Sequence, residues 1–180
     1  QNSHGRLNFH AKDENMEHLG YIIENDLIQS ALFSGIDKNK IEYINAKLNS
    51  LKKTDSGYEV NLNNQTSLSC QLLVGADGAN SKVRTLSAIE VNERDYQQKA
   101  IIANIVSDKS FQKTTWQRFL SDSIIALLPL SENQASIVWS CKNHLADELI
   151  KLDHDKFNQS LSKAVEYRFG NLELETERQV

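Results

Sequence analysis

The chain has 180 residues, of which 39% are hydrophobic and 24% charged, and its formal net charge is −4. This composition is typical of a soluble globular protein. The negative charge argues against a general nucleic-acid binder, because no domain-wide positive field is available to hold phosphates. No apolar run approaches the roughly 20 residues that a membrane-spanning helix needs, and the first ten residues lack the apolar core of a secretory signal.

The cysteines and histidines predict neither a metal site nor a nucleophilic catalytic centre. Cys70 and Cys141 each lie in a strand-like apolar stretch without CxxC spacing. We therefore expect two buried, reduced thiols in a cytosolic protein, although a disulfide between them is left open. The five histidines are scattered, and none is spaced from another as metal ligands are.

The first third of the chain is predicted to begin with a strand and a helix. Residues 5–12 alternate weakly between apolar and polar, which indicates a strand. Asn25 is the expected N-cap of a helix with an apolar stripe, and Gly35 is expected just after its end.

Three strands are predicted next. Residues 41–53 and 57–64 alternate with a period of two and are separated by an Asp-Ser-Gly turn. The following stretch, 66–76, contains the apolar run Leu72–Val74. Such a run is typical of a strand covered on both faces, as in a parallel sheet.

The second half of the chain has a different pattern. Four short apolar stretches with turn signals between the last three predict an antiparallel meander, at residues 99–108, 114–120, 123–130 and 134–141. Two helices should follow, over residues 143–151 and from Asp153 or Asp155 onward. The second helix should bury one apolar face and stop at Gly170; the residues of that face are Phe157, Leu161, Ala164 or Val165, and Phe169.

The stretch CQLLVGADGANSKVR, residues 70–84, carries the strongest functional signal. Ligands gather at the carboxyl ends of strands in covered sheets. Gly75 and Gly78 allow the backbone to come close to a ligand, and Asp77 can accept hydrogen bonds from two hydroxyl groups of a ribose or ribityl chain.

The helix start in this stretch has two readings. Asn80 or Ser81 can cap a helix whose free amides face an anion, while Lys82 and Arg84 add charge for a pyrophosphate. The alternative is an ordinary Asp-Gly turn followed by a common first helical turn. Short glycine motifs alone do not separate these readings.

Three stretches together resemble one family. LLVGADGANSKVR is similar to the middle Asp-Gly motif of the flavin-dependent aromatic hydroxylases related to para-hydroxybenzoate hydroxylase. LGYIIENDLIQSAL at residues 19–32, and WQRFLSDSIIALLPL with ASIVWS between residues 116 and 140, resemble the ubiquinone-biosynthesis hydroxylases of that superfamily. The resemblance covers most of the chain in the same order.

The resemblance implies an FAD site and a site for NAD(P)H. Asp77 and Gly78, with Gly75, are the FAD candidates, Asn25 would lie near the flavin ring, and Lys82 and Arg84 are candidates for NAD(P)H. The family also has a Gly-rich fingerprint and a Gly-Asp motif, and neither pattern occurs here. We therefore expect the central segment of a longer enzyme that by itself binds FAD weakly or not at all.

In the resembled family the antiparallel sheet roofs the substrate pocket above the flavin. Phe119, Leu127, Leu128 and Trp139 are then the expected wall residues, and Arg118 would hold an acidic substrate or form a surface ion pair. Strand alternation places Trp116 and Arg118 on one face and Gln117 and Phe119 on the other. The sequence does not decide which face is the pocket face. The family also tends to have Gly-Pro where this chain has Ser123-Ile124.

The predicted fold class is therefore mixed, α+β with α/β features. Residues 1–97 are expected to form part of a βαβ-type FAD-binding domain. Residues 98–180 are expected to form a substrate-binding domain with an antiparallel sheet and flanking helices.

The resemblance implies an FAD-dependent monooxygenase that hydroxylates an aromatic ring with O₂ and NAD(P)H, without catalytic side chains or a metal. The expected substrate is a polyprenyl phenol of ubiquinone biosynthesis, handled at the inner face of a membrane by a cytoplasmic protein, with other ubiquinone-biosynthesis proteins as partners. A hydroxylase of small aromatic acids, and a non-catalytic assembly module of a multiprotein complex, are the alternatives.

Overall fold

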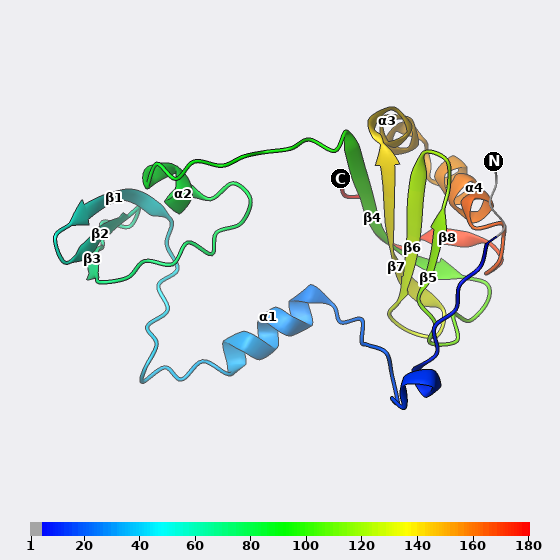
Figure 1. Ribbon diagram of the computed structural model, residues 1–180, viewed down its shortest axis with the longest axis horizontal. Helices are drawn as coiled ribbons and strands as arrows, with labels where there is room; N and C mark the ends of the chain where they lie inside the picture. Colours follow the sequence, from blue (N-terminus) through cyan, green and yellow to red (C-terminus); the bar gives the residue numbers. More distant parts are fainter. Residues whose placement is uncertain (1–4) are drawn as a thin grey trace. The chain divides into compact units, whose positions relative to one another are not determined.

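The computed structural model describes residues 5–180, and Figure 1 shows their secondary structure. The chain divides into two compact units. One unit is formed by residues 35–94, and the other by residues 95–180 together with the segment that ends at Ser34. Each unit has its own antiparallel sheet.

The unit of residues 35–94 is built on a three-stranded sheet. β1 (Leu48–Thr54), β2 (Gly57–Leu62) and β3 (Ser67–Cys70) pair antiparallel in chain order. The turn between β1 and β2 requires Gly57, because its φ is +144° and a Cβ there would lie 2.0 Å from the Cys70 carbonyl oxygen. The short helix α2 (Lys82–Leu86) follows the sheet. Two predicted strands are thus confirmed in shorter form.

Two other strand predictions are wrong. Residues 71–76 form no strand, and Leu72 and Val74 are 77% and 74% exposed. A covered parallel strand needs neighbouring strands, and residues 5–180 provide none for this apolar run. Residues 5–10 also form no strand, and the chain continues into a 3₁₀ helix, η1 (Ala11–Glu14), because a weak alternation without a partner strand fixes no extended structure.

The predicted helix after residue 24 is present as α1 (Asn25–Ser34). The backbone N–H of Ile28 donates to the carbonyl of Glu24 at 3.2 Å, so Glu24 precedes the helix and Asn25 is its first residue rather than its cap. Gly35 directly follows the helix, as predicted. The apolar stripe of α1 is exposed, and its members include Leu27, Ile28 and Leu32.

The second unit is built on a five-stranded antiparallel sheet in the order β5-β6-β7-β4-β8. β4 (Gln98–Ser107) pairs with β7 (Gln134–Lys142), and β5 (Trp116–Phe119) and β6 (Ser123–Pro129) complete the meander that the sequence predicts. β8 (Leu172–Leu174) pairs with β4 and was not predicted, because a strand of three residues has no detectable period.

Helices α3 (Asn143–Lys151) and α4 (His154–Ala164) cover one face of this sheet. The Asp153 side chain caps α4 by accepting from the Lys156 N–H at 2.9 Å. The apolar face predicted for this helix is buried, with Phe157 and Leu161 fully enclosed. The helix ends at Ala164 rather than at Gly170, and the intervening residues form turns in which Val165 and Phe169 still reach the core.

The core of the unit lies between the sheet and these helices. Alternate residues of β4, β6 and β7 point into it and are almost completely buried, among them Ile101, Ile105, Ile125, Leu127, Ile137 and Trp139. The Trp139 ring packs on Phe157, with ring centroids 5.9 Å apart. Fully burying an aliphatic or aromatic side chain contributes roughly 1.5–3 kcal/mol, so this face is the main source of stability for the unit.

Both cysteines are free thiols. Cys141 is buried in the core, and burial raises the pKa of its thiol to about 11. Cys70 is partly exposed, so the expectation of two buried thiols holds only for Cys141. No helix in residues 5–180 is long and apolar enough to span a bilayer.

Two phenylalanines provide a matched test of this packing. Phe157 is 0% exposed and Phe119 is 73% exposed. We expect Phe157→Ala to lower the free energy of unfolding by about 3–5 kcal/mol, and Phe119→Ala to change it by less than about 0.5 kcal/mol. Both tryptophans lie in this unit, so denaturation followed by tryptophan fluorescence reports its unfolding. Equal effects of the two substitutions would contradict the assigned core.

Candidate functional site

The Asp77 carboxylate holds the start of helix α2. Its Oδ1 accepts a hydrogen bond from the Ser81 hydroxyl, and its Oδ2 accepts from the backbone N–H groups of Lys82 at 2.7 Å and Val83 at 3.1 Å. The Ser81 Oγ in turn accepts from the Arg84 N–H at 3.0 Å. The hydrogen bond from Ser81, followed by that from the Val83 N–H, lowers the pKa of Asp77, so the group is ionised near neutral pH.

The two predicted glycines fulfil different requirements of the turn. A Cβ on Gly75 would lie 3.0 Å from the Val83 side chain, so the backbone there packs closely on α2. Gly78 has φ +81°, and a Cβ added to it would meet no atom within 4 Å. Its conformation favours glycine, and its surroundings leave the backbone open on that side.

Both predicted cations contact backbone carbonyl groups of their own unit. Lys82 Nζ donates to the Leu48 carbonyl at 2.7 Å and ties α2 to β1. Arg84 donates through Nη2 to the Ala79 carbonyl at 2.6 Å. The structure thus brings five of the predicted cofactor residues together at one turn, whereas Asn25 is exposed at the start of α1 in the other unit.

The turn fits a hydroxyl-bearing chain better than a pyrophosphate. The first amides of α2 already donate to Asp77 and Ser81, so they are not free to bind an anion. A carboxylate has about four acceptor positions, and Asp77 accepts three hydrogen bonds from its own turn. Asp77 therefore has an acceptor position left for a hydroxyl group of a ligand beside the open backbone of Gly78.

The five residues predicted for the substrate pocket divide between the two faces of the large sheet. Arg118, Leu127 and Trp139 are on the face covered by α3 and α4, because Arg118 pairs with Ile125, Ile125 with Trp139, and Leu127 with Ile137. Phe119 and Leu128 are on the opposite face. These five side chains therefore cannot all line one pocket.

The opposite face is largely apolar and is not covered by either helix. We call it the open face; its apolar members are Ala100, Ile102, Val106, Phe119, Ile124, Ala126, Leu128 and Val138. Phe119 is 73% exposed and Ile102 43% exposed, while Leu127, one residue before Leu128, is completely buried. Of the predicted wall residues, only Phe119 and Leu128 can meet a ligand on this face without unpacking the core.

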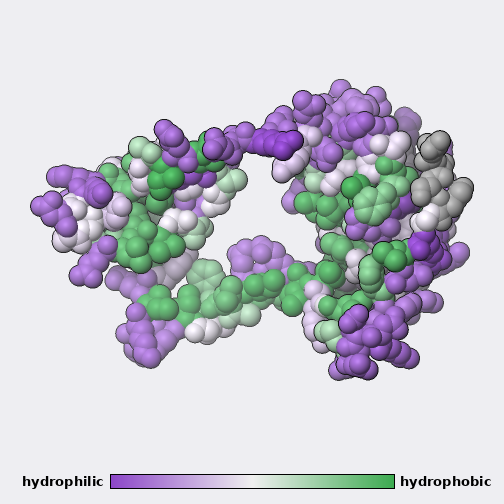
Figure 2. Space-filling model, in the orientation of Figure 1, coloured by the Kyte–Doolittle hydropathy of each residue, from purple (hydrophilic) through white to green (hydrophobic). Residues whose placement is uncertain are grey.

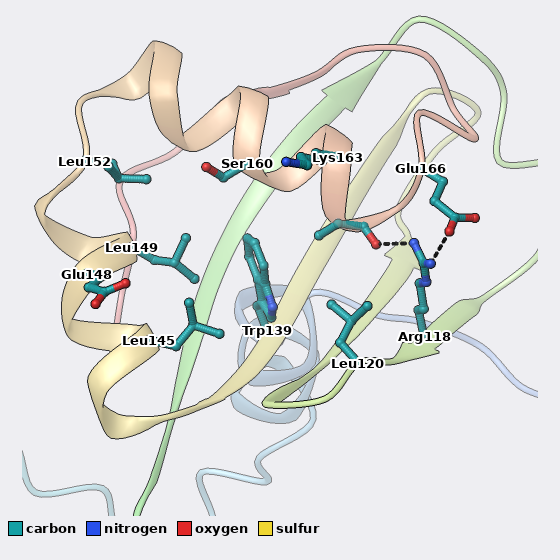
Figure 3. A pocket seen from close by; sticks show the side chains of 11 residues that line it. Arg118, Leu120, Trp139, Leu145, Glu148, Leu149, Leu152, Ser160, Lys163 and Glu166 are labelled. Atoms are coloured by element: carbon teal, nitrogen blue, oxygen red, sulfur yellow. Dashed lines mark hydrogen bonds and ion pairs between the residues drawn. The ribbon is translucent and has the colours of Figure 1, made fainter. Parts of the chain in front are cut away.

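On the helix-covered side, a cleft of about 650 Å³ lies between β5, β7, α3 and α4 (Figure 3). We call it the helix-side cleft; it is lined by Arg118, Leu120, Trp139, Leu145, Glu148, Leu149, Leu152, Ser160, Lys163, Ala164 and Glu166. Arg118 lies at one end, where Nη1 donates to the Ala164 carbonyl at 2.7 Å and Nη2 pairs with Glu166. Sequence patterns gave no sign of this cleft, because periodicity does not show how α3 and α4 pack on the sheet.

Comparison with known proteins shows which family contains this turn, antiparallel sheet and helical cover. Residues 23–180 match the profile of the FAD binding domain family, and the chain belongs to this family. It is 32% identical over 163 residues to the ubiquinone biosynthesis monooxygenase COQ6, mitochondrial, of Mus musculus. The aligned region covers 84% of this chain and 34% of that protein.

A bacterial relative gives a similar result. The chain is 29% identical over 164 residues to the 3-demethoxyubiquinol 3-hydroxylase of Escherichia coli (strain K12), covering 90% of this chain and 42% of the relative. The chain thus spans between a third and a half of the length of these curated relatives.

Solved structures of FAD enzymes share the fold. One is pqsL, a probable FAD-dependent monooxygenase from Pseudomonas aeruginosa, with a TM-score of 0.55 and 18% identity over 73% of this chain and 40% of that chain. Another is the halogenase PltM in complex with phloroglucinol and FAD, with a TM-score of 0.57 and 16% identity over 75% of this chain and 32% of that chain. These likenesses confirm the predicted mixed fold class.

The Asp77 contacts predict a dependence on pH. The pKa of Asp77 is lowered in the folded state, so its stabilisation of α2 is present above the ordinary value of 3.8 and is lost as pH falls through the lower, folded pKa. We expect Asp77→Asn to reduce the hydrogen-exchange protection of the Val83 amide at neutral pH and to remove this pH dependence. Unchanged protection in Asp77→Asn would contradict the capping role.

The Ser81 hydroxyl is a second cap of α2. Ser81→Ala deletes it and should lower the free energy of unfolding of this unit by about 1 kcal/mol.

Proposed function

We propose that this chain is part of an FAD-dependent monooxygenase that hydroxylates an aromatic ring in ubiquinone biosynthesis. The observation that carries the proposal is the similarity to COQ6 and to 3-demethoxyubiquinol 3-hydroxylase along most of the chain. The family match to the FAD binding domain supports the cofactor. When bound, FAD supplies the redox chemistry with O₂, which amino-acid side chains cannot perform.

We propose that Asp77 accepts a hydrogen bond from a hydroxyl group of the FAD ribityl or ribose chain. Its carboxylate is already ionised and held by three donors, so binding costs little reorganisation of the side chain. Gly78 leaves the neighbouring backbone bare for close approach. A role of Lys82 and Arg84 toward NAD(P)H stays a prediction, and it requires these side chains to leave the Leu48 and Ala79 carbonyls.

We propose the open face as a wall of the substrate pocket. Phe119 and Leu128 would contact different parts of the polyprenyl phenol, because Leu128 lies four residues along β6 from Ile124, the partner of Phe119, and the surrounding apolar side chains would exclude water from the reacting ring. The residues paired with Phe119 and Leu128 across β5, β6 and β7, Ile124 and Ser136, carry no charge, which suits a polyprenyl phenol better than a small aromatic acid. Arg118, the expected partner of a carboxylate, is on the other face and is paired with Glu166.

The polyprenyl tail supports the further proposals on location and partners. Such a substrate partitions into a bilayer, so the enzyme would take it up at the membrane surface, at the inner face in a bacterial cell. Contact with other ubiquinone-biosynthesis proteins would help to pass the substrate on.

NADH or NADPH is the proposed reductant. An assembly module without catalysis would bind no flavin in the full protein, which separates that alternative by a single absorption spectrum.

The test of the pocket wall compares two substitutions at one position in the full-length FAD-loaded protein. Leu128→Asp places a charge on the open face, and we expect kcat/KM for a polyprenyl phenol to fall at least tenfold with unchanged FAD content. Leu128→Ile keeps the volume and the apolar character, so it should retain activity.

The outcomes of this comparison are distinct. Equal activity of both Leu128 variants would place the wall elsewhere while leaving the reaction class intact. A wild-type protein that binds FAD and reduces it, yet hydroxylates no phenol, would overturn the proposed function itself.

The 180-residue chain alone should bind FAD weakly or not at all, because its sequence contains neither the Gly-rich fingerprint nor the Gly-Asp motif of the resembled family. Titration followed by flavin fluorescence should show no saturation at chain concentrations that saturate the full-length protein. Flavin that co-purifies with the chain at near-stoichiometric level would contradict this expectation.

A further inference from the structure

We propose that the helix-side cleft is a second ligand site, for an uncharged apolar molecule that carries a hydrogen-bond acceptor oxygen. The cleft lies on the face of the sheet opposite to Phe119 and Leu128, so this site is separate from the proposed substrate wall. The inference does not depend on the proposed function.

The size and walls of the cleft suit a small apolar molecule. Its volume of about 650 Å³ is within the range of pockets for drug-sized ligands, roughly 300–1,000 Å³. The apolar lining consists of the Trp139 ring, four leucines at positions 120, 145, 149 and 152, and the alanine at 164. In Figure 3, Leu145 and Leu120 lie to either side of Trp139.

An unpaired donor within the cleft walls indicates what the ligand must offer. Trp139 is 3% exposed, and its Nε1 is the one buried side-chain nitrogen or oxygen in residues 5–180 without a hydrogen-bond partner. An indole N–H can only donate, and buried donors without a partner are rare enough to need an explanation. The matching ligand group is a carbonyl, ether or hydroxyl oxygen.

A ligand reaches this nitrogen only after a small rearrangement, because Nε1 itself has no contact with solvent. Leu120 lies beside the turn between β5 and β6, and Leu145 lies in the first turn of α3; both are half-buried. A rotamer change of one of these leucines would bring a ligand closer to the Trp139 ring without moving Leu161 or Ile137, which are fully buried in the core.

The charges around the cleft indicate that the ligand carries none. Arg118 and Lys163 contribute two positive charges, and Glu148 and Glu166 contribute two negative charges. Arg118 is occupied by Glu166 and by the Ala164 carbonyl, so neither sign is in excess for a charged ligand. A neutral molecule avoids the cost of breaking this ion pair.

The test uses two probes of similar shape that differ in the acceptor. Benzophenone carries one carbonyl oxygen, and diphenylmethane carries none. The chain has two tryptophans, Trp116 and Trp139, so its NMR spectrum has two indole N–H signals. We expect benzophenone to shift the Trp139 signal and leave that of Trp116 unchanged, and to bind about two- to tenfold more tightly than diphenylmethane, as one neutral hydrogen bond allows.

A substitution and a photochemical reaction sharpen the result. Trp139→Phe removes the donor and keeps an aromatic ring, so the preference for benzophenone should vanish; Trp116→Phe is the matched control. Irradiated benzophenone should crosslink to residues of the cleft.

Equal affinity for both probes in the wild-type chain, or crosslinks confined to other surfaces, would overturn the proposal. If Trp139→Phe fails to fold, the comparison of the two probes on the wild-type chain still decides.

Discussion

The alternation of side chains across the five-stranded sheet is the constraint on which the rest of the second unit depends. Every second residue of β4, β6 and β7 enters a core closed by α3 and α4, as Ile101, Leu127 and Ile137 show. A shift of one residue in any strand would expose that set and bury the other. The same register therefore decides which side chains are structural and which remain free to contact a ligand.

This division changes the interpretation of the predicted pocket. Leu127 and Leu128 are neighbours in sequence, but the first is sealed in the core and the second is on the open face. Trp139 and Arg118 belong to the helix-covered side, where they line a different cleft. Figure 2 shows hydrophobic residues grouped at the surface of both units, so apolar side chains outside the core are exposed to solvent.

Local patterns in the sequence were sufficient for the elements that pair with near neighbours. The strands β5, β6 and β7, joined by short turns, and the helices α3 and α4 follow from periodicity and capping residues such as Asp153. The failures concern long-range requirements. Leu72–Val74 has the composition of a covered strand but no partner strand within residues 5–180, and β8 is defined only by its pairing with β4. Periodicity distinguishes the two faces of the sheet, but only the packing of α3 and α4 decides which face is covered.

The candidate cofactor turn shows the same mixture of local and distant causes. The Asp-Gly pattern correctly indicated a special backbone at Gly78 and a capped helix. It did not reveal that Asp77 itself satisfies the first amides of α2, or that Lys82 is tied to β1. A carboxylate that is fixed by its own helix is well suited to meet a ligand hydroxyl, since its orientation is set before binding.

The most direct measurement is a crystal structure of the full-length protein with FAD and a phenolic substrate bound. The account predicts that the substrate lies along the open face in contact with Phe119 and Leu128, with Leu127 still enclosed beneath α3 and α4, and that a hydroxyl of the coenzyme meets Asp77. A reacting ring held on the helix-covered side, with the open face bare and Asp77 untouched by the coenzyme, would contradict it.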